Sequence, residues 1–363
     1  MSFCIGLECS KCGTRYSAQE IHNSCDCGGQ LLAVYDLAEV ARAVTKQDIA
    51  ARAETMWRYR ELMPIEDDSN IVTLQEGYTP IIALDTLAQE IGQSQLFLKD
   101  EGRLPGGTFK ARGASSGVSK AKELGIEIIA VPTAGNAGGA WSAYGARAKM
   151  KVIVVMPYDA PEINKRECIS LGAHLFLVKG LISEAGAIVA DACRNLGCFS
   201  ISTFNEPYRL EGKKTLGLEI AEQFGWEFPE VILYPCGGGV GLVGIWKAFK
   251  ELREMGWVTG NGPRMVAVQS SGCAPVVKAF AQGEDHCEQW SGAQTVADGL
   301  RVPKPLADSL ILNTIKESRG CAVAVSEEDI AEAMLRLARK EGILACPEGA
   351  ATVLAVESLK QSG

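Results

Sequence analysis

The stretch Gly106–Gly113 reads Gly-Gly-Thr-Phe-Lys-Ala-Arg-Gly, and it decides the interpretation of this chain. It places Lys110 in a turn of small residues, after the strand-like segment 96–99 and before a segment with helical spacing. Because desolvation disfavours the charged form of an amine, we expect a lysine held between backbone and Phe109 to lose its proton readily and to form a Schiff base. Taken alone, the stretch also fits an ordinary helix start with a solvated lysine.

Around this stretch, short apolar segments alternate with longer segments of helical spacing. Strands are expected at 96–99, 127–131, 152–156, 174–178, 231–234 and 265–269, and helices at 113–124, 138–148, 163–171, 183–196, 210–224, 241–255 and 327–341. This alternation predicts an α/β fold with parallel sheets built from βαβ units. In such sheets, ligands bind beyond the carboxyl ends of the strands.

Two glycine-rich loops each join a predicted strand to a predicted helix. Residues 132–139 read Pro-Thr-Ala-Gly-Asn-Ala-Gly-Gly, which offers backbone N–H groups to a carboxylate and places the amide of Asn136 at the tip. Residues 235–242 read Pro-Cys-Gly-Gly-Gly-Val-Gly-Leu, where glycines remove side chains that would block a phosphate at a helix N-terminus. Neither loop matches a nucleotide-binding pattern. Each also fits a tight turn that needs glycine.

The N-terminal segment 1–35 has a different character, because cysteines occur there in two pairs with glycines behind each pair. The candidate metal ligands are Cys9, Cys12, Cys25 and Cys27. They predict a zinc-ribbon-like segment with a structural zinc. The second pair is C-x-C rather than C-x2-C, so Cys4 and His22 are possible substitute ligands. A ribbon that packs without metal is the alternative.

Size and charge narrow the class of protein. A chain of 363 residues with 47% hydrophobic residues and 39 glycines indicates a compact enzyme of two lobes with a small appendage. The formal net charge of −8 argues against a nucleic-acid surface. No apolar run approaches the ~20 residues that span a bilayer, and the N-terminus lacks the pattern of a signal peptide. The 13 scattered cysteines fit reduced thiols, so we expect a cytoplasmic protein without a membrane partner.

The lysine turn and the two loops, in this order, resemble the fold-type II pyridoxal-phosphate enzymes of the tryptophan synthase β-like superfamily, and most closely the threonine synthase family. The similarity includes the segments 98–101, 206–215 and 347–351. It implies a two-lobed fold with parallel twisted sheets, an amino-acid substrate and a homodimer. The resemblance divides the chain into the ribbon-like segment 1–35, a large cofactor-binding domain at 36–106 and 181–363, and a small domain at 107–180.

The resemblance also implies roles for individual residues. Lys110 would bind pyridoxal phosphate covalently and shuttle protons, and Asn136 would hydrogen-bond the phenolic oxygen of the cofactor. The residues expected at the cofactor phosphate are Gly237, Gly238, Gly239, Val240 and Gly241, and those expected at the substrate carboxylate are Thr133, Ala134, Gly135 and Ala137. The implied reaction converts O-phospho-L-homoserine and water to threonine and phosphate. Arg209 is expected at the substrate phosphate, whereas Lys213 and Lys214 are expected to be solvated at a helix start.

The chain departs from the family pattern in three places. Ala111 stands where many threonine synthases carry an aspartate, and residues 203–205 lack an Asn-Ser pair that helps some members hold the substrate phosphate. In the family, a loop beyond the segment 347–351 usually supplies a Ser or Thr hydroxyl to the pyridine nitrogen of the cofactor. In this chain, that loop would follow Gly363. Two alternatives therefore stay open. One is a threonine or serine ammonia-lyase, or another pyridoxal-phosphate enzyme of β-elimination or β-replacement. The other is a non-catalytic relative that binds cofactor or zinc.

Overall fold

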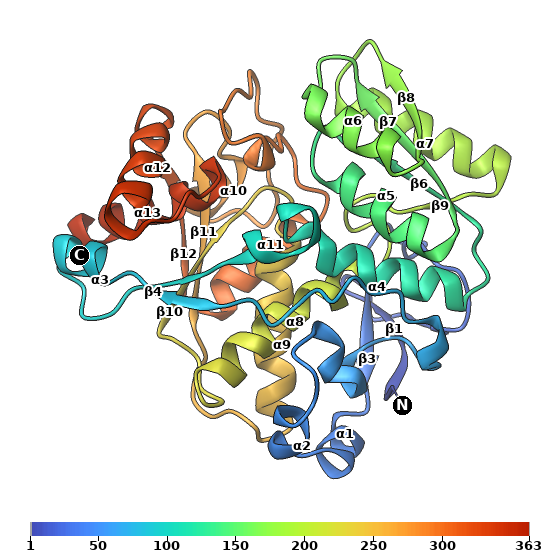
Figure 1. Cartoon of the computed structure of the whole chain (residues 1–363), viewed down its shortest axis with the longest axis horizontal. Coiled ribbons are helices and arrows are strands. Elements are labelled where there is room, and N and C mark those ends of the chain that lie inside the picture. Colours follow the sequence, from blue (N-terminus) through green and yellow to red (C-terminus); the bar gives the residue numbers. More distant parts are fainter. Residues whose placement is uncertain (1, 363) are drawn as a thin grey trace. The chain divides into compact units, whose positions relative to one another are not determined.

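The computed structural model describes residues 2–362, which form two compact units (Figure 1). Unit 1 runs to Tyr78 and takes in Arg103–Glu219 and Glu251–Trp257. Unit 2 holds Thr79–Gly102, Ile220–Lys250 and the chain from Val258 onward. The predicted limits of the cofactor-binding and small domains stay a prediction.

Unit 1 contains an antiparallel sheet at the N-terminus and a larger parallel sheet. Its strands are β1 (Cys4–Cys9), β2 (Arg15–Tyr16), β3 (Leu31–Tyr35), β6 (Ile128–Pro132), β7 (Lys151–Pro157), β8 (His174–Val178) and β9 (Phe199–Ser200). Its helices are α1 (Leu37–Ala43), α2 (Lys46–Ala50), α4 (Lys110–Glu123), α5 (Ala137–Ala148), α6 (Glu162–Ser170), α7 (Ile182–Leu196) and α8 (Tyr208–Gln223), the last of which continues into unit 2. The sheet orders are β2-β1-β3 and β8-β7-β6-β9.

The parallel sheet of unit 1 is apolar on both faces, as expected for strands that are covered by helices on each side. Successive side chains of a strand point to opposite faces. Val154 of β7 belongs to the core cluster that includes Trp141 of α5 and Val118 of α4. Val155 belongs to a second cluster with Val189 of α7. The loop after β6 therefore leaves the carboxyl edge of a sheet whose strands β6 and β7 are mostly buried.

Unit 2 is built on a second parallel sheet. The strands of unit 2 are β4 (Ile81–Ala83), β5 (Phe97–Lys99), β10 (Val231–Pro235), β11 (Arg264–Ser270) and β12 (Cys321–Val325), of which β4 and β5 form a separate antiparallel pair. Its helices are α3 (Asp85–Ile91), α9 (Val240–Glu254, which ends in unit 1), α10 (Pro275–Gln282), α11 (Asp308–Glu317), α12 (Glu327–Glu341) and α13 (Pro347–Ser362). The parallel strands have the order β10-β11-β12. Val266 and Val268 of β11 pack with Ala351 and Ala355 of α13.

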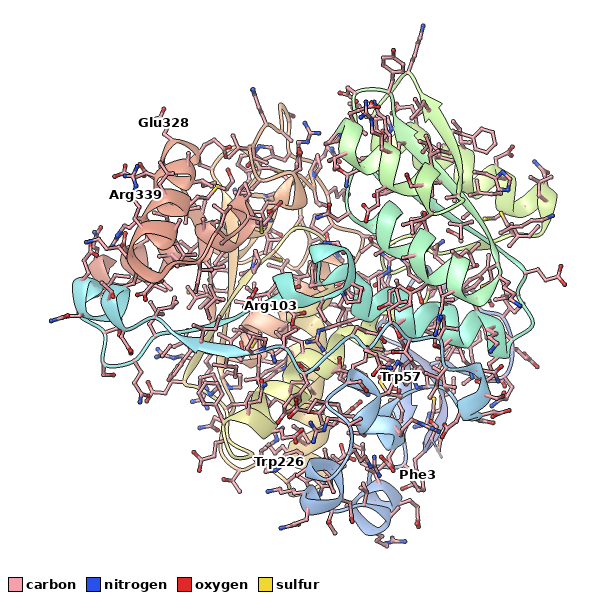
Figure 2. All side chains as sticks on the ribbon, in the orientation of Figure 1. Phe3, Trp57, Arg103, Trp226, Glu328 and Arg339 are labelled. Carbon is pink, nitrogen blue, oxygen red and sulfur yellow. The ribbon has the colours of Figure 1, made fainter. Side chains whose placement is uncertain are left out.

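Helix α12 illustrates how the sequence fixes an element of unit 2. Its first turn is acidic and its last turn is basic, which complements the helix dipole. Figure 2 labels Glu328 and Arg339 in these two turns. Gly342 in the left-handed conformation ends the helix. The prediction of a helix over 327–341 is confirmed.

The other predicted strands and helices are also present, with ends that differ by a few residues at most. Segment 96–99 differs in its pairing, because β5 pairs antiparallel with the short strand β4 and lies outside the parallel sheets. Strand β12 is not among the strands that the sequence predicts, since its alternating alanines and valines are a weak signal. Among the residues that the structure describes, no helix is long and apolar enough to cross a membrane.

Candidate active site and cysteine cluster

Lys110 is the first residue of α4, directly after a tight turn. Gly106 and Gly107 both have positive φ, and the hydroxyl of Thr108 accepts a hydrogen bond from the Lys110 amide at 3.3 Å. The half-buried Lys110 points its Nζ at the Phe109 ring, 4.0 Å from the ring centre. The predicted placement of this lysine beside Phe109 is therefore confirmed.

Two glycines let α4 and α8 approach closely. A Cβ on Gly212 would lie 2.0 Å from the Arg112 carbonyl oxygen, and a Cβ on Gly113 would lie 2.7 Å from Cγ of Arg209. Neither position tolerates a larger residue without a shift of the backbone or a neighbouring side chain. This close approach places residues of α8, among them Lys213, against the first turn of α4.

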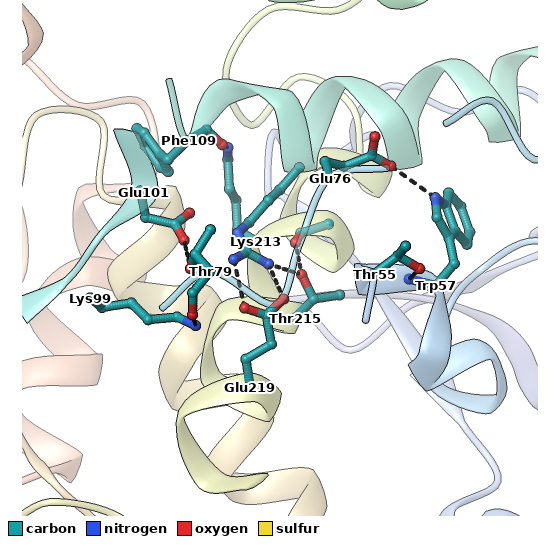
Figure 3. A network of polar contacts seen from close by, with 12 residues as sticks. Thr55, Trp57, Glu76, Thr79, Lys99, Glu101, Phe109, Lys213, Thr215 and Glu219 are labelled. Atoms are coloured by element: carbon teal, nitrogen blue, oxygen red, sulfur yellow. Dashed lines mark hydrogen bonds and ion pairs between the residues drawn. The ribbon is translucent and has the colours of Figure 1, made fainter. Parts of the chain in front are cut away.

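A buried ion pair fixes the same two helices. The Arg112 guanidinium, two residues after Lys110, contacts both carboxylate oxygens of Glu219 at 2.5 and 2.8 Å. It also donates to the hydroxyl of Thr215 at 2.9 Å (Figure 3, where Thr215 and Glu219 are labelled). Both side chains of the ion pair are 0% exposed. Bidentate pairs of this kind have fixed geometry, so α4 is held in register with α8.

Lys213 and Lys214 are buried, so the prediction of solvated lysines was wrong. Lys213 is 1% exposed, donates a hydrogen bond to the Phe109 carbonyl and lies 3.9 Å from the centre of the Phe109 ring (Figure 3). Lys214 is 0% exposed and lies 2.5 Å from Glu211 and 2.8 Å from Glu251. Their burial comes from packing against segments distant in sequence, which the local pattern does not reveal.

A fully buried carboxylate joins α4 and α5. Glu76 accepts hydrogen bonds from the Trp57 indole at 3.0 Å, from the Ser115 hydroxyl at 2.6 Å and from the Tyr144 hydroxyl at 2.5 Å (Figure 3 labels Trp57 and Glu76). Burial, followed by the charge of Glu76, raises the pKa of Tyr144. Since Ser115 is on α4 and Tyr144 on α5, this network joins the helix that begins at Lys110 to the helix that follows the asparagine loop.

The predicted asparagine loop follows β6 and opens α5. The Thr133 hydroxyl accepts from the Gly135 amide at 3.1 Å and closes the turn. The side-chain oxygen of Asn136 accepts a hydrogen bond from the side-chain NH2 group of Asn164, on α6, at 3.0 Å. This contact directs the NH2 group of Asn136 to other partners, so the side chain can act as a donor. Asn164 was not foreseen, because a single asparagine in a helix gives no signal.

Glu167 of α6 also reaches the first turn of α5. A Cβ on Gly139 would lie 2.1 Å from a Glu167 carboxylate oxygen, and a Cβ on Gly138 would lie 2.8 Å from Cys168 Sγ. Burial raises the pKa of Glu167. The second half of the loop is therefore glycine-rich because α6 packs against it, whereas a Cβ on Gly135 would meet nothing within 4 Å.

Arg209 lies near the start of α8 and is buried, with only 6% of its surface exposed to solvent. Its guanidinium lies 3.3 Å from Glu206, donates to Thr203 at 2.9 Å and donates to the Ile201 carbonyl. It also lies 5.0 Å from the Trp141 ring centre. Burial raises the pKa of Glu206, and the Arg209 charge opposes this shift. A guanidinium has five N–H donors, so these contacts leave capacity for an anion.

The triglycine loop lies in unit 2, between β10 and α9. At three positions of this loop, the surrounding structure or the backbone conformation favours glycine over a larger residue. A Cβ on Gly237 would lie 2.2 Å from the Gly299 oxygen, a Cβ on Gly241 would lie 1.9 Å from the Tyr234 hydroxyl, and Gly239 has φ of +73°. The first N–H groups of α9 have no acceptor within the helix. Donors and a positive dipole end suit an anion such as a phosphate, and the role of this loop stays a prediction.

The four predicted cysteines come together in the ribbon. The Sγ atoms of Cys9, Cys12, Cys25 and Cys27 all lie within 4.8 Å of one another. The Tyr16 hydroxyl donates to Cys25 Sγ at 3.1 Å, and the hydrogen bond with Thr14 lowers the pKa of Cys12 to about 6. Four convergent sulfur ligands, one of them readily ionised, fit a tetrahedral zinc ion.

Comparisons with known proteins agree with this arrangement. A family model described as pyridoxal-phosphate dependent enzyme matches residues 72–363. Threonine synthase from Methanocaldococcus jannaschii is 35% identical over 356 residues, which cover 98% of this chain and 87% of the relative. Threonine synthase from Methanosarcina acetivorans is also 35% identical, over 98% of this chain and 87% of the relative. The structure of maize serine racemase matches with a TM-score of 0.69 and 22% identity over 79% of this chain and 83% of that one, which shows a shared fold.

Proposed function

Since this chain belongs to the pyridoxal-phosphate dependent enzyme family, we propose that it is a threonine synthase, which converts O-phospho-L-homoserine and water to L-threonine and phosphate. The observation that carries the proposal is the 35% identity to a threonine synthase over 98% of the chain. The likeness to a racemase supports the fold alone. The close packing of α8 against the start of α4 adds a basic residue, Arg209, to the part of the chain that holds Lys110.

Pyridoxal phosphate, when bound, supplies an electron sink for negative charge that develops at Cα and Cβ of the substrate. In the proposed roles, Lys110 holds the cofactor covalently and then moves protons at these two carbons. The Asn136 NH2 group donates to the phenolic oxygen of the cofactor and is oriented by Asn164. The amides of residues 237–241 donate to its phosphate, because the first turn of a helix offers donors and a positive dipole end.

The substrate has two anionic ends, and the residues of unit 1 offer a partner for each. We assign the carboxylate to Thr133, Ala134, Gly135 and Ala137, where a helix begins and Gly135 leaves open space. We assign the substrate phosphate to Arg209. Charge-assisted hydrogen bonds to an oxyanion are the strong ones, and burial strengthens them further. Departure of phosphate would thus be assisted by a fixed cation.

The proposal extends to the other expected properties of the protein. A zinc ion held by Cys9, Cys12, Cys25 and Cys27 would be structural, because four protein ligands leave no open position for chemistry. A cytoplasmic location and a homodimer stay predictions. Both can be checked directly, the first by cell fractionation and the second by light scattering.

The experiment that tests the proposed reaction uses Arg209→Ala and two substrates in parallel. We expect turnover of O-phospho-L-homoserine to fall by on the order of 10²-fold or more in kcat/KM, the scale for loss of one charged partner. Any elimination from free threonine, which carries no phosphate, should change little. Ammonia and a keto acid formed from threonine by the unchanged protein, with phosphohomoserine left intact, would favour the ammonia-lyase alternative instead.

A further inference from the structure

The cysteine ribbon touches the rest of unit 1 through Asn23, two residues before Cys25. The Asn23 side-chain amide donates to the carbonyl oxygens of Ser200 at 2.9 Å and Asn205 at 2.6 Å. These acceptors are the two ends of one short loop, residues 200–205, which links β9 to the segment before α8. One amide group therefore spans the base of this loop.

The same loop supplies the contacts of Arg209. Ile201 and Thr203, which accept from the guanidinium, both lie between the two carbonyls that Asn23 holds. A network within the loop couples its ends further, since the Asn205 amide donates to the Ser200 hydroxyl at 3.0 Å. A displacement of the loop ends would therefore move the acceptors of Arg209.

The loop contains a residue in an unfavourable backbone conformation. Phe204 has φ of +59° and is 5% exposed. A bulky residue at positive φ persists only where its surroundings determine the conformation. Asn23 is one of the groups that do so, because its hydrogen bonds clamp the chain on both sides of Phe204.

The ribbon has its own backbone hydrogen bonds close to Asn23. The Cys25 amide donates to the Gly29 carbonyl at 3.0 Å, and the Gly28 amide donates to the Cys25 carbonyl at 2.8 Å. The cysteine cluster follows immediately in sequence. Asn23 is therefore joined, through two residues of chain, to a hydrogen-bonded turn of the ribbon.

We propose that Asn23 is a positioning residue for Arg209, and that the cysteine ribbon, through this one side chain, sets the loop that aims the guanidinium at the anionic group of the substrate. This inference rests on the proposed function, in which Arg209 binds the substrate phosphate. It gives the ribbon a part in substrate affinity although the ribbon contributes no reacting group.

The test compares Asn23→Asp with a matched control in the metal-loaded holoenzyme. Asn23→Asp keeps the size of the side chain but removes both donated hydrogen bonds. The control is Gln19→Ala, because the side-chain amide of Gln19 also connects the ribbon to the rest of unit 1, through Glu66, which is not part of the Arg209 loop. A loss that merely reflects loosened docking of the ribbon should affect both variants.

Three readouts separate the inference from the proposed reaction. For Asn23→Asp, we expect KM for O-phospho-L-homoserine to rise about tenfold, the effect of one or two net hydrogen bonds, with kcat and cofactor affinity little changed. Binding of inorganic phosphate, measured by calorimetry, should weaken to a similar degree. Amide hydrogen exchange in residues 201–209 should become faster. Gln19→Ala should match the unchanged protein in all three.

Phosphate binding and hydrogen exchange need no turnover, so they decide the inference even if phosphohomoserine proves not to be a substrate. In that case the proposed function fails alone. Unchanged phosphate affinity in Asn23→Asp would overturn the inference, as would exchange at 201–209 equal to that of the control. Equal losses in both variants would also overturn it, because they would assign Asn23 to docking alone.

Discussion

The ammonium group of Lys213 donates a hydrogen bond to the carbonyl oxygen of Phe109 and lies 3.9 Å from the centre of that residue's ring. The Nζ atom of Lys110 lies 4.0 Å from the centre of the same ring. One aromatic residue therefore contacts two lysine amines, one from α4 and one from α8. The turn that precedes Lys110 is fixed by a buried cation on a neighbouring helix, which makes Lys213 a positioning residue for Lys110.

Replacement of Lys213 by methionine removes this anchor while it preserves most of the side-chain volume. We expect kcat to fall by on the order of 10²-fold, the scale of a small displacement of a catalytic group. The absorption band of the cofactor bound to Lys110 should persist, since Lys110 itself is unchanged. Steady-state kinetics and spectra check this. The matched control is Lys122→Met on the exposed side of α4, which should leave kcat within about twofold. A Lys213→Met protein with full kcat would contradict the positioning role.

The ion pair between Arg112 and Glu219 should be costly to break from one side only. Arg112→Met leaves a buried carboxylate without its partner, so we expect the free energy of unfolding to fall by about 3–5 kcal/mol. The double variant Arg112→Met, Glu219→Leu should lose much less, because neither charge remains buried. Urea denaturation of both variants measures the difference. Equal losses in the single and double variants would show that packing, rather than charge, dominates at this contact.

The close approach of α4 and α8 depends on Gly212. A Cβ at this position would meet the Arg112 carbonyl at 2.0 Å, so Gly212→Ala should destabilise the protein by about 1–3 kcal/mol or more. Gly186→Ala on α7 is the control, because its Cβ would meet nothing within 4 Å. Alanine there should stabilise the helix by about 0.5–1 kcal/mol. Opposite shifts in the thermal midpoint are expected, and shifts of the same sign would contradict the packing argument.

Thiol reactivity should distinguish the cysteines of the cluster from those of the core. The lowered pKa of Cys12, about 6, means that its thiol is ionised above this pH, so alkylation of the metal-free protein should rise through pH 6 and then level off. Burial raises the pKa of Cys236 to about 12, so this thiol stays protonated and unreactive at neutral pH. Zinc should protect Cys12 from iodoacetamide in peptide mapping, whereas the slow labelling of Cys346, whose pKa burial raises to about 11, should not change with zinc. Labelling of Cys12 that zinc does not slow would contradict the proposed metal site.

Much of this fold could be predicted from local patterns. The turn before Lys110, the loop that ends in Asn136 and the cysteine pairs each carry their information within a few residues, and the structure places them as expected. A parallel sheet covered on both faces leaves continuous apolar segments such as β7, which sequence reasoning detects well.

The missed features depend on contacts between distant segments. Lys213 is buried because glycines in α4 and α8 allow the helices to meet, and Arg112 and Glu219 are 107 positions apart. Asn164 and Glu167 reach the start of α5 from a helix whose sequence reads as an ordinary surface helix. Local spacing assigns such residues to solvent, since it contains no information on which face another element will cover.

The central claim is most directly tested by the products that the purified protein forms from O-phospho-L-homoserine in the presence of pyridoxal phosphate. The account predicts threonine and inorganic phosphate in equal amounts, with both lost in Lys110→Ala although that variant should keep its fold. Absence of threonine, together with ammonia and a keto acid formed from free threonine or serine, would contradict the assignment as a threonine synthase.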